Sequence, residues 1–337
     1  MKYVNQPVRK TDAMSLVTGK PVYTDDLAPK DCLIVKVLRS PHANAWVEDI
    51  KTGTAEKVAG IACILTYKDV PKKRFTLAGQ TAPEMSPDDR LILDRHVRFV
   101  GDAVAIVAGE TEEAVDKALK RIRVDYRVEA PVLDIHKAKD NPILVHPEED
   151  WKLKIPLGGD NKRNLCASAV EEHGNVDEVL SKCKYTVERT YHTKSKSADN
   201  DGDFPYRLLS GPFWETDRVV FYTDSFPCKK NRRKSTRHSG FQSPRDQAAN
   251  WRRLWCETDI CQRDLSGNRY MENRRPSKMI FSRYESMICS SPRHEMEITV
   301  RAGADENGII KAIDLYTFVQ HWGIRRTQFY NSRTQRS

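Results

Sequence analysis

The 337-residue chain has no apolar run close to the about 18 residues that a membrane-spanning helix needs. Its first residues contain no apolar core of a secretory signal, so we expect a cytoplasmic protein. Eight cysteines are scattered without regular spacing, which in a reducing compartment favours thiols over a disulfide framework. Hydrophobic residues make up 39%, which is low but sufficient for a core, so disorder of the whole chain is excluded.

Motifs of several enzyme classes are also missing. The chain has no P-loop, no G-x-G-x-x-G and no G-x-S-x-G motif, and its nine histidines form no H-x-x-x-H pair. Cys256 and Cys261 lack the second pair of ligands that a structural zinc site requires. From these residues we assign no catalytic residue, no cofactor-binding residue and no metal ligand.

The first 194 residues have the patterning of an ordinary α/β protein. Apolar runs at 33–38, 61–65 and 103–108 have the length of strands, and the third suits a strand buried on both faces. Thr111 is a candidate N-cap of a helix with an acidic first turn and a basic last turn. Residues 124–128 alternate apolar and polar and predict an edge or half-buried strand, which completes a strand–helix–strand unit.

Two further regions of the chain are regularly patterned. Asn175 is a candidate cap of a short helix, and 184–190 alternate loosely as a strand. Residues 297–300 and 309–315 flank an Asn-Gly pair, which between alternating runs is a strong signal for a β-hairpin.

The stretch 195–278 is different from both neighbours. Ile, Leu and Val occupy only 7 of its 84 positions, and no helical or strand period persists. It carries 17 Lys and Arg against 11 Asp and Glu, which is +6 of the total charge of +9. Its tract 229–234, Lys-Lys-Asn-Arg-Arg-Lys, with aromatic residues nearby, suits a nucleic-acid contact or a localisation signal. The alternative is a charge run exposed to solvent, and we expect no nucleic-acid partner.

Four blocks of the N-terminal part resemble one enzyme family. Residues 17–26 read Val-Thr-Gly-Lys-Pro-Val-Tyr-Thr-Asp-Asp, similar to the V-T-G-x-A-x-Y-x-D-D opening of molybdenum hydroxylases, with Pro21 in place of the usual alanine. Blocks 36–43, 66–71 and 97–105 resemble the next segments of the same family in order and spacing. The chain therefore resembles the molybdenum-binding subunit of the xanthine dehydrogenase and aldehyde oxidase family over 1–193, and again over 276–317.

The resemblance implies an α/β (α+β) fold. It implies an a/b hammerhead domain at 1–133, a linker at 134–165 rich in Pro, Asp and Gly, and the start of an incomplete molybdopterin-binding domain at 166–317. It further implies a xanthine dehydrogenase that hydroxylates purines such as hypoxanthine and xanthine with water as the oxygen source. Molybdopterin is the family's cofactor, electrons pass to partner subunits that carry FAD and 2Fe-2S clusters, and no membrane is involved.

One substrate-binding residue follows from the same resemblance. Residues 291–295 read Ser-Pro-Arg-His-Glu and resemble a family segment whose arginine hydrogen-bonds the purine and stabilises its negative charge. The planar donor fork of Arg293 suits that role; the alternative is a surface arginine beside a strand. The family's general base, a glutamate, lies beyond Ser337, so we expect this chain to be a truncated and inactive fragment that binds no molybdopterin.

The stretches 195–275 and 318–337 are predicted to be translated out of frame. Where the family has Gly-Gly-Gly-Phe-Gly-x-Lys-Gln, residues 251–259 read Trp-Arg-Arg-Leu-Trp-Cys-Glu-Thr-Asp. Plausible codons for these nine residues, read one base later, encode Gly-Gly-Gly-Phe-Gly-Ala-Lys-Gln. The segment 318–324 treated in the same way also yields a sequence similar to the family. A real frameshift and a sequencing error both remain open.

Overall fold

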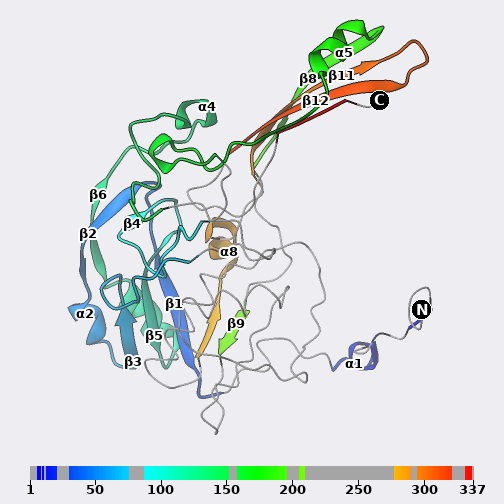
Figure 1. The fold of residues 1–337 in the computed structure, drawn as a ribbon. Helices are drawn as coiled ribbons and strands as arrows, with labels where there is room; N and C mark the ends of the chain where they lie inside the picture. Colours follow the sequence, from blue (N-terminus) through cyan, green and yellow to red (C-terminus); the bar gives the residue numbers. More distant parts are fainter. Residues whose placement is uncertain are drawn as a thin grey trace.

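The computed structural model in Figure 1 describes most of the two regularly patterned parts of the chain. The described residues are 6–8, 10, 13–20, 30–75, 87–151, 158–195, 277–289 and 294–320, with the backbone alone of 205–208 and 331–335. Among the described residues, no helix has both the length and the apolar character needed to cross a membrane.

A five-stranded sheet forms the centre of the body. Its order is β3 (Ile61–Leu65), β5 (Ala103–Gly109), β1 (Leu33–Arg39), β10 (Ser277–Ile280) and β9 (Pro205–Leu208). The predicted strands at 33–38, 61–65 and 103–108 are confirmed. β1 pairs antiparallel with β5 and parallel with β10, so a segment more than 200 residues further along the chain completes the sheet.

A three-stranded sheet packs beside it, in the order β4 (His96–Val97), β2 (Ala45–Lys51) and β6 (Arg123–Val128). β6 confirms the predicted edge strand. It pairs with β2, whereas β5 belongs to the central sheet. The strand–helix–strand unit thus bridges two sheets, because β6 finds its pairing partner in β2.

β5 separates two apolar cores, which explains why all seven of its residues are buried. Ala103, Ile106 and Ala108 face a core shared with β1, β10 and Phe281. Val104, Ala105 and Val107 face a core shared with β2 and the helix α3 (Glu112–Leu119). The short helix α2 (Gly53–Glu56) contributes Ala55 to the second core.

Both predicted helix caps are confirmed. The side chain of Thr111 accepts a hydrogen bond from the amide of Ala114 at 3.2 Å, at the start of α3. The side chain of Asn175 accepts one from the amide of Glu178 at 3.2 Å, at the start of α5 (Val176–Lys182). Each cap satisfies an amide that lacks a partner within its own helix.

A third sheet extends from the body as an arm (Figure 1). Its order is β7 (Val170–His173), β13 (Asn331–Gln335), β12 (Ile310–Val319), β11 (Met296–Ala304) and β8 (Tyr185–Thr193). β11 and β12 form the predicted hairpin, and Gly308 adopts the positive φ of 79° that its turn requires. α5 packs on one face of this sheet through Leu180 and Ala312.

The remaining elements connect or flank these sheets. They are α1 (Ala13–Val17), α4 (Ile135–Ala138), the 3-10 helix η1 (Asn161–Arg163) and α8 (Arg283–Cys289). Within the stretches predicted to be out of frame, the described strands are β9, β13 and the last two residues of β12. Strands pair through main-chain N–H and C=O groups, which nearly every residue carries whatever its side chain.

Candidate functional site

The residues singled out in the sequence lie mainly outside the described residues. Arg293, the predicted substrate-binding residue, lies between the described ends of α8 and β11, outside both. The basic tract 229–234, the segment 251–259 with Cys256, and Cys261 are outside them as well. The role assigned to Arg293 therefore stays a prediction.

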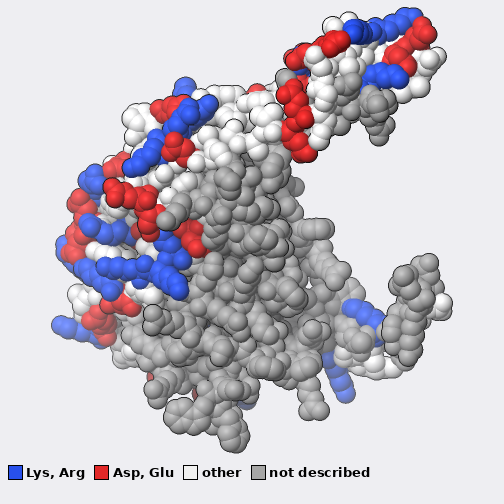
Figure 2. Space-filling view, in the orientation of Figure 1, with Lys and Arg blue, Asp and Glu red and all other residues white. Residues whose placement is uncertain are grey.

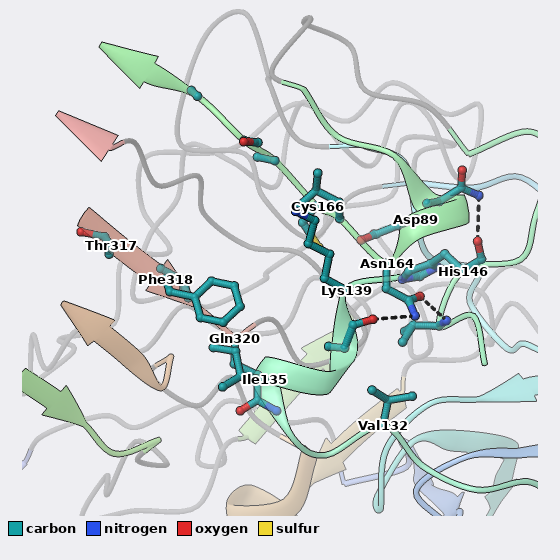
Figure 3. A pocket seen from close by; sticks show the side chains of 18 of the residues that line it. Asp89, Val132, Ile135, Lys139, His146, Asn164, Cys166, Thr317, Phe318 and Gln320 are labelled. Carbon is teal, nitrogen blue, oxygen red and sulfur yellow. Dashed lines mark hydrogen bonds between the residues drawn. The ribbon is translucent and has the colours of Figure 1, made fainter. Parts of the chain in front are cut away.

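The chain that follows Arg293 is attached to the end of β12. Nδ1 of His294 lies 3.2 Å from the carbonyl oxygen of Gln320, and the amide of Gln320 donates to the carbonyl of Glu295 at 3.0 Å. Nε2 of Gln320 donates to the carbonyl of Leu133 at 3.1 Å. Because Gln320 also lines the cavity in Figure 3, this part of the chain reaches the edge of that cavity.

A cavity of about 260 Å³ lies between the end of β12 and the segment 134–165 (Figure 3). Ile135 of α4 and Phe318 of β12 form part of its apolar wall, while Asp89, Lys139 and His146 add polar groups. Its size is close to the lower end of the range for ligand pockets, about 300–1,000 Å³.

Two amide side chains in the cavity wall fix the surrounding loops. Asn164, in the left-handed region with φ 53°, accepts from the amide of Val145 and donates to the carbonyls of Ala138 and Ile143. Asn161 donates to the carbonyls of His146 and Glu148. These hydrogen bonds hold the wall in place and occupy both amides.

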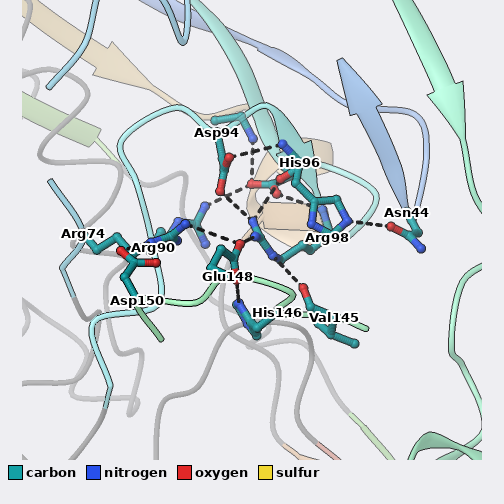
Figure 4. A network of polar contacts seen from close by, with 12 residues as sticks. Asn44, Arg74, Arg90, Asp94, His96, Arg98, Val145, His146, Glu148 and Asp150 are labelled. Atoms are coloured by element: carbon teal, nitrogen blue, oxygen red, sulfur yellow. Dashed lines mark hydrogen bonds and ion pairs between the residues drawn. The ribbon is translucent and has the colours of Figure 1, made fainter. Parts of the chain in front are cut away.

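A buried network of charged side chains joins the segment 134–165 to the body (Figure 4). Arg98, with 5% of its side chain exposed, forms ion pairs with Asp94 at 2.8 Å and with Glu148. Arg74 approaches the same Glu148 oxygen at 3.4 Å, and Arg90 pairs with Asp102 at 3.2 Å. The network fastens the middle of the predicted linker, through Glu148, to the hammerhead region.

The electrostatics of the network lower the pKa values of Glu148 and His96. Burial acts to raise the pKa of Glu148, but His146 and the Arg98 guanidinium lower that pKa to about 2. Burial, with the charge of Arg98, lowers the pKa of His96 to about 4, so this imidazole is neutral at pH 7. The His96 ring stacks on Trp46 with centroids 4.4 Å apart, and its Nε2 lies 2.8 Å from Oδ1 of Asn44.

Sequence reasoning missed this network because its partners are far apart in the chain. Arg98 and Glu148 are 50 residues apart, and periodicity carries no information on such a pairing. Asp94 and Arg98 are four residues apart, but they flank the strand β4, so the i,i+4 rule for helices could not have indicated this pair. Among the described residues, no group of three or more His, Cys, Asp or Glu side chains is arranged to hold a metal ion.

Two family models match the chain, one after the other. Residues 18–130 match the aldehyde oxidase and xanthine dehydrogenase a/b hammerhead domain. Residues 271–328 match the molybdopterin cofactor-binding domain.

Curated relatives and solved structures point the same way. The chain is 28% identical over 344 residues to a probable hypoxanthine oxidase, XdhD, of Escherichia coli, covering 94% of this chain and 35% of that protein. It is 28% identical over 320 residues to a probable subunit of the xanthine dehydrogenase of Bacillus subtilis, covering 93% and 40%. The aldehyde oxidoreductase of Desulfovibrio gigas shares the fold, with a TM-score of 0.70 at 17% identity, over 93% of this chain and 34% of that one.

The chain thus spans between about a third and two fifths of the length of these relatives. The hammerhead match covers β1 to β6 of the two-sheet body, and the cofactor-domain match includes β10, which completes the central sheet, together with β11 and β12. The chain belongs to the molybdenum hydroxylase family of xanthine dehydrogenases and aldehyde oxidases, with an a/b hammerhead domain followed by part of a molybdopterin-binding domain.

Proposed function

We propose that this chain corresponds to part of a molybdenum-binding subunit that hydroxylates purines, hypoxanthine or xanthine, with oxygen taken from water. The observation that carries the proposal is the similarity over 94% of the chain to a probable hypoxanthine oxidase of E. coli. The B. subtilis relative, a probable xanthine dehydrogenase subunit, supports the same substrate class and a complex of several subunits. Partner subunits with FAD and 2Fe-2S clusters would accept the electrons in that complex.

Arg293 is the residue of this chain that we propose for purine binding. Its guanidinium offers coplanar N–H donors to the oxygen and nitrogen atoms of a purine ring that gains negative charge during the reaction. The described neighbours His294 and Glu295 are hydrogen-bonded to Gln320, which supports a fixed position for the chain next to Arg293.

The residues of this chain do not fit the molybdopterin that supplies the hydroxylation chemistry in the family. A run of glycines lets a ligand approach the backbone closely because glycine has no Cβ. Where the resemblance places that run, this chain has Trp251, Arg252 and Arg253, each of which carries a Cβ and a large side chain. We therefore propose that the polypeptide as printed is inactive, and that 195–275 and 318–337 are translated out of frame.

Expression of two versions of the gene tests this function. One version encodes the printed chain, and the other restores the frame across codons 195–275 and 318–337 and continues it through the glutamate that is the family's general base. The measurements are molybdenum per mole of protein and hypoxanthine- or xanthine-dependent dye reduction, with partner subunits co-expressed. We expect neither molybdenum nor activity in the printed chain; appreciable activity there would refute its inactivity. A restored chain that binds molybdenum but oxidises neither purine would refute the substrate class.

A further inference from the structure

The arm has one covered face and one uncovered face. On the covered face, Leu180 and Cys183 lie so close to Gly303 that a Cβ there would be 2.8 and 2.7 Å from their side chains. Arg301 on the same face pairs with Asp314 across the strands and with Asp177 of α5. These contacts fix which residues of the alternating strands face α5.

The strand register gives the composition of the other face. Residues 185, 187, 189 and 191 of β8 stand opposite 304, 302, 300 and 298 of β11, and Val300 and Ala302 stand opposite Leu315 and Ile313 of β12. We call this surface the open face of the arm; its central part is Tyr185, Val187, Arg189, Tyr191, Ile298, Val300, Ala302, Ile313 and Leu315, with Thr317 and Thr193 at its end nearer the body.

The open face is apolar and exposed to solvent. Tyr185, Val187 and Tyr191 are 57%, 51% and 57% exposed, and Ile313 is 38% exposed. An antiparallel sheet face that meets water is normally polar, and a contiguous exposed apolar patch marks an interaction site. In the space-filling view the arm stands apart from the body, with uncharged residues beside charged ones (Figure 2).

We propose that the open face is the docking surface for the polypeptide that makes up the rest of the molybdenum-binding subunit, and the proposal rests on the function proposed above. The relatives give the reason: the E. coli and D. gigas proteins contain this fold within chains of which it spans 35% and 34%. In these relatives the same fold is therefore part of a chain in which the remaining polypeptide is about twice as long.

Charge defines the partner surface further. Arg189 lies in the middle of the open face, between Val187 and Tyr191, and forms no ion pair with a described residue. Docking of an apolar surface would desolvate this guanidinium, which is costly unless a carboxylate pairs with it. The partner surface is thus apolar, with an Asp or Glu opposite Arg189.

Co-expression of two polypeptides tests the docking. The printed chain carries an affinity tag, and the second polypeptide is the part of the E. coli hypoxanthine oxidase relative that this chain does not cover, whose folding is verified by its co-purification with the matching tagged segment of that relative. We expect the second polypeptide to co-purify with the tagged chain. Val187→Asp and, separately, Tyr191→Ser should reduce its recovery by about tenfold or more, because each removes a central apolar contact.

Glu188→Gln is the matched control, because it changes an exposed side chain of the same strand on the face toward α5 without placing a second cation opposite Arg301. It should leave the recovery unchanged, and thermal unfolding should show that all three variants remain folded. No co-purification, or equal recovery from the open-face variants and the control, would overturn the proposal. A chain that sediments alone as a dimer, and as a monomer after Val187→Asp, would assign the face to a second copy instead. None of these readouts requires molybdenum or purine oxidation, so they separate this proposal from the proposed activity.

Discussion

Replacing Phe281 by alanine tests whether the segment after 195–275 completes the core of the central sheet. Phe281 is 1% exposed and packs in the core that also contains Leu33, Ile106 and Met279. The Arg39 guanidinium lies 4.9 Å from the centroid of its ring. A buried Phe→Ala substitution costs about 3–5 kcal/mol, and a poorly solvated cation–π contact adds about 1 kcal/mol.

We therefore expect Phe281→Ala to lower the free energy of unfolding by about 5 kcal/mol, which is a large part of the about 5–15 kcal/mol typical of a domain. In urea this corresponds to a fall in the midpoint of about 2 M for an m-value of about 2–3 kcal/mol/M. Tyr284→Ala, at a position 68% exposed in α8, is the control and should change stability by less than about 0.5 kcal/mol. Equal midpoints for the two variants would show that 277–289 is not part of the core.

Four further predictions follow from the packing. Glu148→Gln should cost about 2 kcal/mol at pH 7 in urea unfolding, after a discount for solvent screening. The pKa of Glu148 is lowered from 4.5 to about 2 in the folded chain, so its contribution to stability is complete above pH 4.5 and is lost as the pH falls through 2. The difference in unfolding free energy between the original chain and Glu148→Gln should therefore shrink in acid, and a difference that stays constant would refute this. Thr111→Ala should cost about 1 kcal/mol by removing the cap of α3, and Thr111→Ser should restore most of it in thermal unfolding. Gly303→Val should displace α5, seen as faster amide exchange in 176–182, since Leu180 and Cys183 leave no space for a side chain; unchanged exchange would contradict the packing. A polypeptide of residues 1–133 should fold, with a lower melting temperature than the full chain because it lacks Phe281; an unfolded circular dichroism spectrum would contradict this.

Local features of the fold could be predicted because they depend on neighbouring residues. The caps at Thr111 and Asn175 and the Asn-Gly hairpin were recognisable since residue type and spacing determine each of them. The continuous apolar run of β5 also indicated that both of its faces are covered.

Long-range features could not be predicted in the same way. The parallel pairing of β1 with β10 joins Leu33 to Ser277, and no periodicity specifies a partner at that separation. The ion pair of Arg98 with Glu148 depends on how a segment without regular pattern folds back onto the body. For the candidate site, only the family resemblance provided a residue, Arg293, because its surroundings have no motif of their own.

The nucleotide sequence of the gene, determined anew across codons 190–337, tests the central claim most directly. That claim is that a molybdenum hydroxylase sequence has been joined to residues from another reading frame. We expect the adjacent frame to encode Gly-Gly-Gly-Phe-Gly-Ala-Lys-Gln at codons 251–259, with single-base changes near both ends of 195–275. A confirmed gene whose adjacent frame encodes no such motif would contradict the claim and would assign 195–275 to the native protein.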